Sequence, residues 1–123
     1  GLIPGYGATQ RLSKLIGYGK TLELVMTGEM LTADEAAKIG LVNHVCNHEQ
    51  LFEMTMDLAQ KIASKSVFTL AAAKRTIKAS LNNSLEEGIK IEAEEFANLF
   101  DSNDKEEGVK AFIERSEPEW TDS

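Results

Sequence analysis

A glycine-rich turn near the start of the sequence is the pattern with the clearest chemical use. Gly5 and Gly7 precede residues 8–16, whose apolar side chains recur at helical spacing. A Gly-x-Gly turn that enters a helix leaves backbone N–H groups free at the positive end of the helix dipole. Such a turn can hold an anion, a carbonyl oxygen or an ordered water. Taken alone the pattern favours a plain turn, because it lacks the full spacings of dinucleotide-binding and phosphate-binding loops.

A second group of chemically capable side chains comprises His44, Cys46 and His48. In an extended segment His44 and Cys46 share a face, but His48 falls at the start of the following helix. No carboxylate or second cysteine completes a tetrahedral metal site. A Cys–His nucleophile pair also lacks a third group to orient the histidine. We therefore expect no metal.

Composition narrows the class of protein. The 123 residues suit one domain, and 42% hydrophobic with 27% charged residues is ordinary for a globular chain. A net charge of −7 argues against a nucleic-acid binder. The longest uncharged stretches, residues 1–10 and 39–48, are far shorter than the roughly 20 residues of a membrane span. The single cysteine excludes an internal disulfide and fits a reducing compartment, so we expect a cytoplasmic protein.

Helical spacing dominates the sequence and predicts a mainly α fold. Short helices are expected over residues 8–16 and 20–26, and the second half is expected to be helical throughout. Residues 41–46 lack helical period and predict a short strand or an extended link. Capping boxes, in which a side chain and a backbone N–H satisfy each other at a helix start, are expected at three places: Thr32–Glu35, Ser84–Glu87 and Asn103–Glu106.

Each predicted helix has one apolar face, which must pack against a partner. On pattern alone, the phenylalanines at positions 96, 100 and 112 belong to a core or an interface.

Charge is separated between neighbouring segments. Residues 58–81 hold five basic residues and no acid, whereas residues 86–107 hold nine acids and two lysines. A hairpin of the two would bring opposite charges together. The alternatives are two solvated faces, where each exposed pair contributes about 0–1 kcal/mol, or a positive surface that attracts a nucleotide phosphate.

Several motifs in order resemble one known family. The run Pro4–Leu12 is similar to the P-G-x-G-G-T-Q-R-L motif of the crotonase superfamily, the enoyl-CoA hydratases and isomerases, with Ala8 in place of the second glycine of the pair. The resemblance continues to the end of the chain, through Thr27–Glu29, Thr32–Ala36, Gly40–Val42, Lys61–Ala63, Ala73–Lys74 and Glu106–Arg115. It implies the helical C-terminal, trimerisation part of the crotonase fold.

The resemblance also implies roles for particular residues. Gly5 matches the position whose backbone N–H holds the reacting water, and we take it as the catalytic candidate. Phe96 and Phe100 match residues that wall the acyl pocket. Phe112 and Arg115 match an aromatic and basic pair near the CoA moiety. Acyl-CoA is then the substrate, and no further cofactor is implied.

Family members are about twice as long, and their two catalytic glutamates and oxyanion-hole N–H groups match positions upstream of Gly1. The first residue, Gly1, is compatible with a fragment, a processed or trimmed chain, or simple removal of an initiator methionine. We therefore expect the C-terminal fragment of an enoyl-CoA hydratase, a lyase of fatty acid metabolism, inactive without its upstream half. The alternatives are a fragment of another family enzyme, such as an isomerase, or a non-catalytic helical interaction module.

The resemblance further divides the chain by role. Residues 1–47 would end the crotonase core, and residues 48–123 would form the oligomerisation region. The expected partners are acyl-CoA, the upstream half, and further copies in a homotrimer or hexamer. We expect no nucleic acid or membrane as partner.

Overall fold

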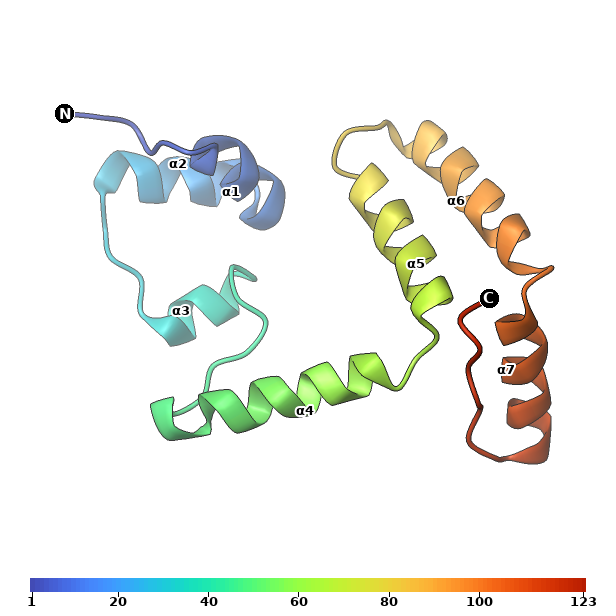
Figure 1. The fold of residues 1–123 in the computed structure, drawn as a ribbon. Coiled ribbons are helices and arrows are strands. Elements are labelled where there is room, and N and C mark those ends of the chain that lie inside the picture. The colour runs from blue at the N-terminus through green and yellow to red at the C-terminus, as the bar shows by residue number, and fades with distance from the viewer. The chain divides into compact units, whose positions relative to one another are not determined.

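The computed structural model describes all 123 residues, and its regular structure is entirely helical (Figure 1). This confirms the predicted mainly α class. The elements in chain order are α1 (Ala8–Ile16), α2 (Tyr18–Thr27), α3 (Ala33–Lys38), the 3-10 turn η1 (His48–Gln50), α4 (Leu51–Ala63), α5 (Val67–Ala79), α6 (Leu85–Leu99) and α7 (Asn103–Glu114).

The chain divides into two compact units, Gly1–Leu51 and Phe52–Ser123. In the first unit α1 packs against α2, and in the second α5 packs against α6. The predicted boundary after residue 47 divides the chain by expected role in an enzyme and not by compactness. It stays a prediction.

Side-chain caps explain where several helices begin. Thr32 Oγ1 accepts from the Glu35 N–H at 3.3 Å, while Glu35 accepts from the Thr32 N–H at 2.9 Å. Ser84 and Glu87 make the same reciprocal pair at 3.3 and 3.0 Å. Two of the three predicted capping boxes are thus confirmed.

The third predicted box, starting at Asn103, is wrong by one residue. Ser102 caps α7 instead, because its hydroxyl accepts from the Lys105 N–H at 3.1 Å. The same hydroxyl donates to the Leu99 carbonyl at 2.7 Å, so it joins the end of α6 to the start of α7.

No strand forms over residues 41–46. Gly40 adopts a left-handed conformation with φ +76° after α3, and the N–H groups of Leu41 and Val42 both point back to the Ala36 carbonyl, at 2.8 and 3.4 Å. The segment then runs on without regular structure to η1. Of the two predicted alternatives, the strand is wrong and the link is what the structure contains.

The apolar stripes of the helices are mostly left open. The only buried hydrophobic residues are three alanines, Ala36, Ala72 and Ala111. On α4, Leu58 and Ile62 remain 46% and 50% exposed. None of the helices is long and apolar enough to cross a bilayer.

The basic and acidic segments do form a hairpin, since α5 and α6 lie side by side (Figure 1). Arg75 on α5 donates to both carboxylate oxygens of Glu95 on α6, at 2.9 and 2.8 Å. The hydrogen bond between Arg75 and Glu95 lowers the pKa of the Glu95 carboxyl and raises the pKa of the Arg75 guanidinium. One bidentate pair therefore realises the predicted charge complementarity.

Candidate functional site

The glycine-rich turn closes tightly before α1. The Ala8 N–H donates to the Gly5 carbonyl at 3.0 Å, and the Gln10 and Arg11 N–H groups donate to the Gly7 carbonyl at 3.2 and 3.0 Å. Tyr6 and Gly7 both have left-handed backbones, with φ of +54° and +75°. Residues 1–7 are exposed, so the turn presents its backbone to the outside of the unit.

The two glycines of this turn have different structural needs. A Cβ on Gly7 would lie 2.9 Å from Arg11 Nη1, in addition to the strain of its positive φ. A Cβ on Gly5 would meet nothing within 4 Å. Within the chain, therefore, the turn requires glycine at position 7 but leaves open space beside position 5.

Two of the predicted pocket aromatics lie together. The rings of Phe96 and Phe100 meet edge to face with centroids 5.1 Å apart, a favourable arrangement for aromatic pairs. Lys105 Nζ stands 5.6 Å from the Phe100 ring centroid, within the range of a cation–π contact. Both rings remain more than half exposed, which leaves apolar surface for a further contact.

Phe96 also lines a groove between α5 and α6. The groove has a volume of about 260 Å³ and includes Ala72, Ile77 and Leu99 among its apolar walls, with the Glu95 carboxylate beside them. Phe100 is not part of this groove. The aromatic pair therefore spans from the groove to the start of α7.

The other predicted pair, Phe112 and Arg115, lies at the end of α7. Phe112 is 85% exposed. Arg115 closes the helix in a left-handed conformation with φ +55°, and its N–H donates to the Ala111 carbonyl. The negative end of the helix dipole also stabilises a basic side chain in this position.

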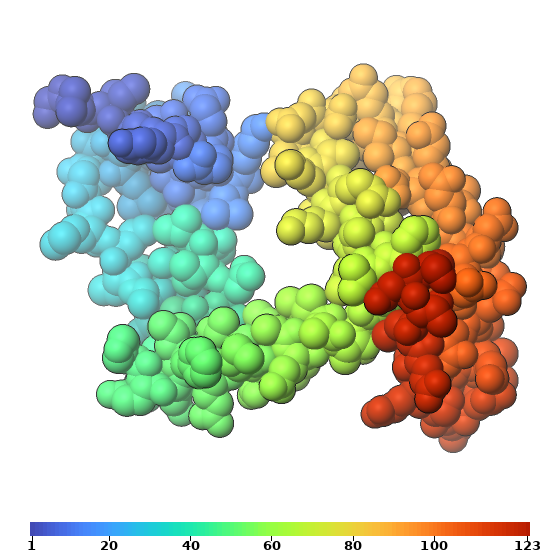
Figure 2. Space-filling view, in the orientation of Figure 1, coloured from blue at the N-terminus to red at the C-terminus, as the bar shows by residue number.

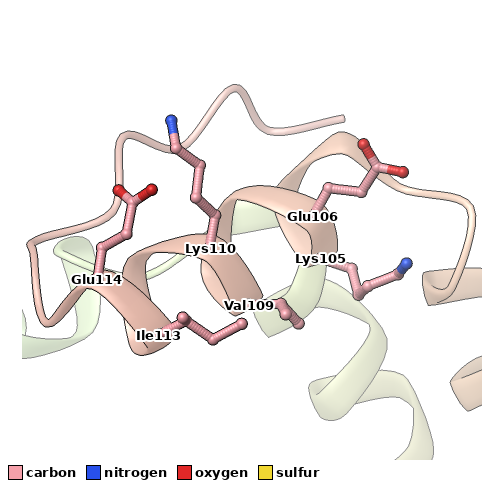
Figure 3. Close-up of a pocket in the computed structure, with 6 residues that line it drawn as sticks. All are labelled: Lys105, Glu106, Val109, Lys110, Ile113 and Glu114. Atoms are coloured by element: carbon pink, nitrogen blue, oxygen red, sulfur yellow. The ribbon is translucent and has the colours of Figure 1, made fainter.

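A shallow hollow lies along α7 but does not include that pair. Figure 3 shows Val109 and Ile113 side by side on the helix, with charged side chains around them. The hollow has a volume of about 390 Å³. Its lining residues are Lys105, Glu106, Val109, Lys110, Ile113 and Glu114.

The predicted site residues are thus divided between the units. Gly5 belongs to the unit Gly1–Leu51, and the four pocket candidates belong to the unit Phe52–Ser123. Within the second unit the rings of Phe96 and Phe100 are in contact, whereas Phe112 lies on α7 and Arg115 follows as its C-cap. No group of three or more His, Cys, Asp or Glu side chains is arranged to hold a metal ion.

Sequence reasoning missed one buried polar centre, Asp104, which is 2% exposed. Burial raises the pKa of this carboxyl, but hydrogen bonds from Ser66, Thr121 and Asp122 outweigh it and leave the pKa lowered. An aspartate in the first turn of a helix is a common sequence feature, and only its distant partners distinguish this one.

Comparison with known proteins decides the family. The model of the family described as enoyl-CoA hydratase/isomerase matches residues 1–123. The chain belongs to the enoyl-CoA hydratase/isomerase family. This confirms the resemblance on which the site residues were chosen, while the roles of those residues stay predictions.

Individual members of the family are similar in sequence to this chain over almost the whole of its length. It is 47% identical over 120 residues to a Dictyostelium discoideum protein named "Probable enoyl-CoA hydratase, mitochondrial", covering 98% of this chain and 43% of that protein. It is 39% identical over 122 residues to "Enoyl-CoA hydratase, mitochondrial" of Pongo abelii, covering 99% and 42%. The chain therefore spans a little under half the length of these relatives.

A solved structure supports the same fold. The crystal structure of an enoyl-CoA hydratase from Bacillus anthracis matches with a TM-score of 0.94 and 35% identity, over 99% of this chain and 47% of that one. The helical arrangement described above is therefore that of about half of a crotonase-fold protein.

Proposed function

We propose that residues 1–123 act as the C-terminal part of an enoyl-CoA hydratase, which adds water across the double bond of a 2-enoyl-CoA thioester. The observation that carries this proposal is the family match across the whole chain, together with 47% identity to a relative named as such a hydratase. Because the chain spans under half the length of that relative, the proposal assigns the hydratase activity to these residues together with an upstream half.

In this proposal Gly5 contributes a backbone N–H to the reacting water. No residue of the chain accepts a hydrogen bond from this N–H, and the space beside its α-carbon is open. The nearby start of α1 adds the positive end of a helix dipole, which favours the developing hydroxide character of an attacking water.

The aromatic candidates supply binding surface. Phe96 and Phe100 would wall the acyl chain, since their paired rings present apolar area that the chain itself leaves exposed. Phe112 and Arg115 would contact the CoA moiety, where a guanidinium can pair with a phosphate in a bidentate manner. Arg115 caps α7 through its backbone N–H, so its guanidinium is available to contact a phosphate.

The acid–base chemistry lies elsewhere in this proposal. Hydration needs carboxylates to handle the water and the α-proton, and donors to the thioester oxygen worth about 3–4 kcal/mol each. The family resemblance places both in an upstream half. The 123 residues alone are then expected to be inactive.

The second candidate function is a non-catalytic helical oligomerisation or interaction module. The exposed apolar stripe of α4 favours it, since such a face buries its surface only against another chain or segment. In either case we propose that the helical region joins copies into a trimer or a hexamer. An isomerase or another enzyme of the family is the remaining alternative for the chemistry.

We also propose a cytoplasmic location, supported by the single free cysteine, Cys46. The two relatives described above are named as mitochondrial, so fractionation of cells that express the tagged protein is the deciding measurement.

The experiment that tests the proposed function measures loss of the enoyl thioester absorbance of crotonyl-CoA. The chain alone should show no turnover, and the chain joined to an upstream half should hydrate the substrate. Turnover by the chain alone that disappears when one of its own carboxylates is replaced would contradict the upstream placement of the acid–base groups. Failure of the joined protein, with oligomers still formed, would favour the interaction module.

A further inference from the structure

Helix α7 is held in place by something other than helix packing. The closely packed helix pairs are α1 with α2 and α5 with α6, and α7 packs closely against none. Yet its first turn contains the buried Asp104. The segment that surrounds this residue is 117–123, which we call the strap. The strap, red in Figure 1, runs back beside α7, and in Figure 2 its atoms lie against the start of α5.

The Asp104 carboxylate holds the strap by several hydrogen bonds. Its Oδ1 accepts from the Thr121 N–H at 2.7 Å and from the Thr121 hydroxyl at 3.0 Å. The Asp122 N–H donates to both carboxylate oxygens at 3.1 Å. The backbone N–H of Asp104 in turn donates to the Ser123 carbonyl at 3.1 Å. One residue of α7 therefore fixes three consecutive residues of the strap.

The strap in turn fixes the start of α5. The Asp122 side chain accepts from the Val67 N–H, one of the unpaired donors of the first turn, at 2.8 Å. Trp120 donates from Nε1 to the Ser64 carbonyl at 2.8 Å, just before that helix. The Ser66 hydroxyl, which caps α5 by accepting from Thr69, is also hydrogen-bonded to Asp104.

Packing reinforces the same contact. The Trp120 ring lies against α7 at Gly108, where an added Cβ would stand 3.3 Å from two ring carbons. A glycine at this point of the helix thus gives the indole room to lie close to the backbone. The strap is attached to α7 by an apolar contact as well as by Asp104.

We propose that Asp104 is a positioning residue: by holding the strap, which caps α5, it fixes the orientation of α7 and so of Phe112 and Arg115. The consequence for substrate rests on the proposed function, since it assumes that these two residues contact CoA. The linkage of α7 to α5 through the strap does not depend on that assumption.

The structural test is hydrogen exchange on the full chain, followed by mass spectrometry. Asp104→Asn keeps the size of the side chain but loses its charge and turns an NH₂ toward donors. Exchange at Val67 and at Thr121–Asp122 should become about tenfold faster or more, as expected when buried charged hydrogen bonds are lost. Glu106→Gln is the matched control, because it makes the same charge change at an exposed position of the same helix turn.

A second variant separates a linkage from general loss of stability. Asp122→Ala removes the acceptor of the Val67 N–H but leaves the Asp104 carboxylate, so Val67 should exchange faster while Thr121 stays protected. In Asp104→Asn, exchange within α6 should stay unchanged. Equal acceleration in α6, or no acceleration at Val67, would overturn the proposal.

The kinetic test uses the whole enzyme that contains these residues. Since Phe112 and Arg115 would bind a part of the substrate remote from the reacting atoms, Asp104→Asn should raise KM for crotonyl-CoA and leave kcat nearly unchanged. Glu106→Gln should change neither. A fall in kcat at unchanged KM would overturn the positioning role. If the parent enzyme does not hydrate crotonyl-CoA, the proposed function fails, and the exchange measurement still decides whether the strap links the two helices.

Discussion

At the scale of single residues, the glycine-rich turn separates a structural requirement from a functional one. Gly7 has a left-handed backbone, and a Cβ there would displace the Arg11 guanidinium, whereas Gly5 has neither restriction. Glycine at position 5 therefore has no explanation within the chain itself. Close approach of a ligand or of another segment is the explanation that the proposed water-binding role offers.

The first prediction compares alanine at these two positions. Gly7→Ala should lower the free energy of unfolding by about 1 kcal/mol or more, because an L-residue at positive φ is strained and its Cβ displaces the Arg11 guanidinium. Gly5→Ala should leave it nearly unchanged. Urea denaturation of both variants checks this, and equal losses would mean that the turn restricts position 5 as well.

A second prediction at this scale concerns Glu87 in the capping box of α6. Hydrogen bonds from the Ser84 N–H and then from its hydroxyl lower the pKa of this carboxyl. Its contribution to stability is therefore present above the pKa of the unfolded chain and is lost as the pH falls through the folded value. Carboxyl-carbon NMR titration should show the lowered pKa.

Ser84→Ala provides the control for that titration. It removes the hydroxyl donor and keeps the backbone N–H, so the pKa of Glu87 should rise partway toward its ordinary value. If the titration of Glu87 is the same in both proteins, the hydroxyl does not stabilise the carboxylate in solution.

At the scale of elements, the start of α7 tests whether the cap has been assigned to the right residue. Ser102 is 6% exposed, and its hydroxyl accepts from the Lys105 N–H in the first turn of α7 and donates to the Leu99 carbonyl of α6. Ser102→Ala should cost about 1 kcal/mol of stability, the usual effect of a lost helix cap. Asn103→Ala should cost clearly less, because that side chain makes one exposed hydrogen bond, to Ser123. The reverse order in thermal denaturation would restore Asn103 as the cap.

Local features of this kind were predictable, and long-range ones were not. The boxes at Thr32 and Ser84 follow from residues three positions apart, and both formed as expected. The helical class follows equally from spacing within single segments. Asp104 differs because its hydrogen-bond partners lie 17 to 38 residues away. The side chains of Trp120 and Asp122 have partners 56 and 55 residues away. The periodic spacing of side chains does not predict hydrogen bonds between residues so far apart in the sequence.

The site shows the same limit. The motif match selected Phe96 and Phe100, and their ring contact follows from their i, i+4 spacing on one helix face. How Gly5 relates to them depends on contacts between distant segments, which spacing does not specify. The choice of Phe112 and Arg115 likewise rests on the family motif alone, since both are outside the hollow on α7.

At the scale of the whole molecule, the balance between buried and open apolar surface is the main feature. The chain buries only three hydrophobic residues, all alanines, while leucines, isoleucines and phenylalanines on most helices stay open. Each Å² of such surface removed from water contributes about 25 cal/mol, so open stripes of this extent are a strong driving force for association.

The proposed oligomer can be tested on α4, whose Leu58 is 46% exposed within an apolar stripe. Leu58→Lys would place a charge in the buried interface and should shift the protein to smaller species in sedimentation velocity at equal concentration. Gln60→Lys adds the same charge to the same helix away from the stripe and should leave the distribution unchanged. If both variants sediment like the parent protein, α4 lies outside the interface; if the parent itself sediments as a monomer, the proposed trimer or hexamer is wrong.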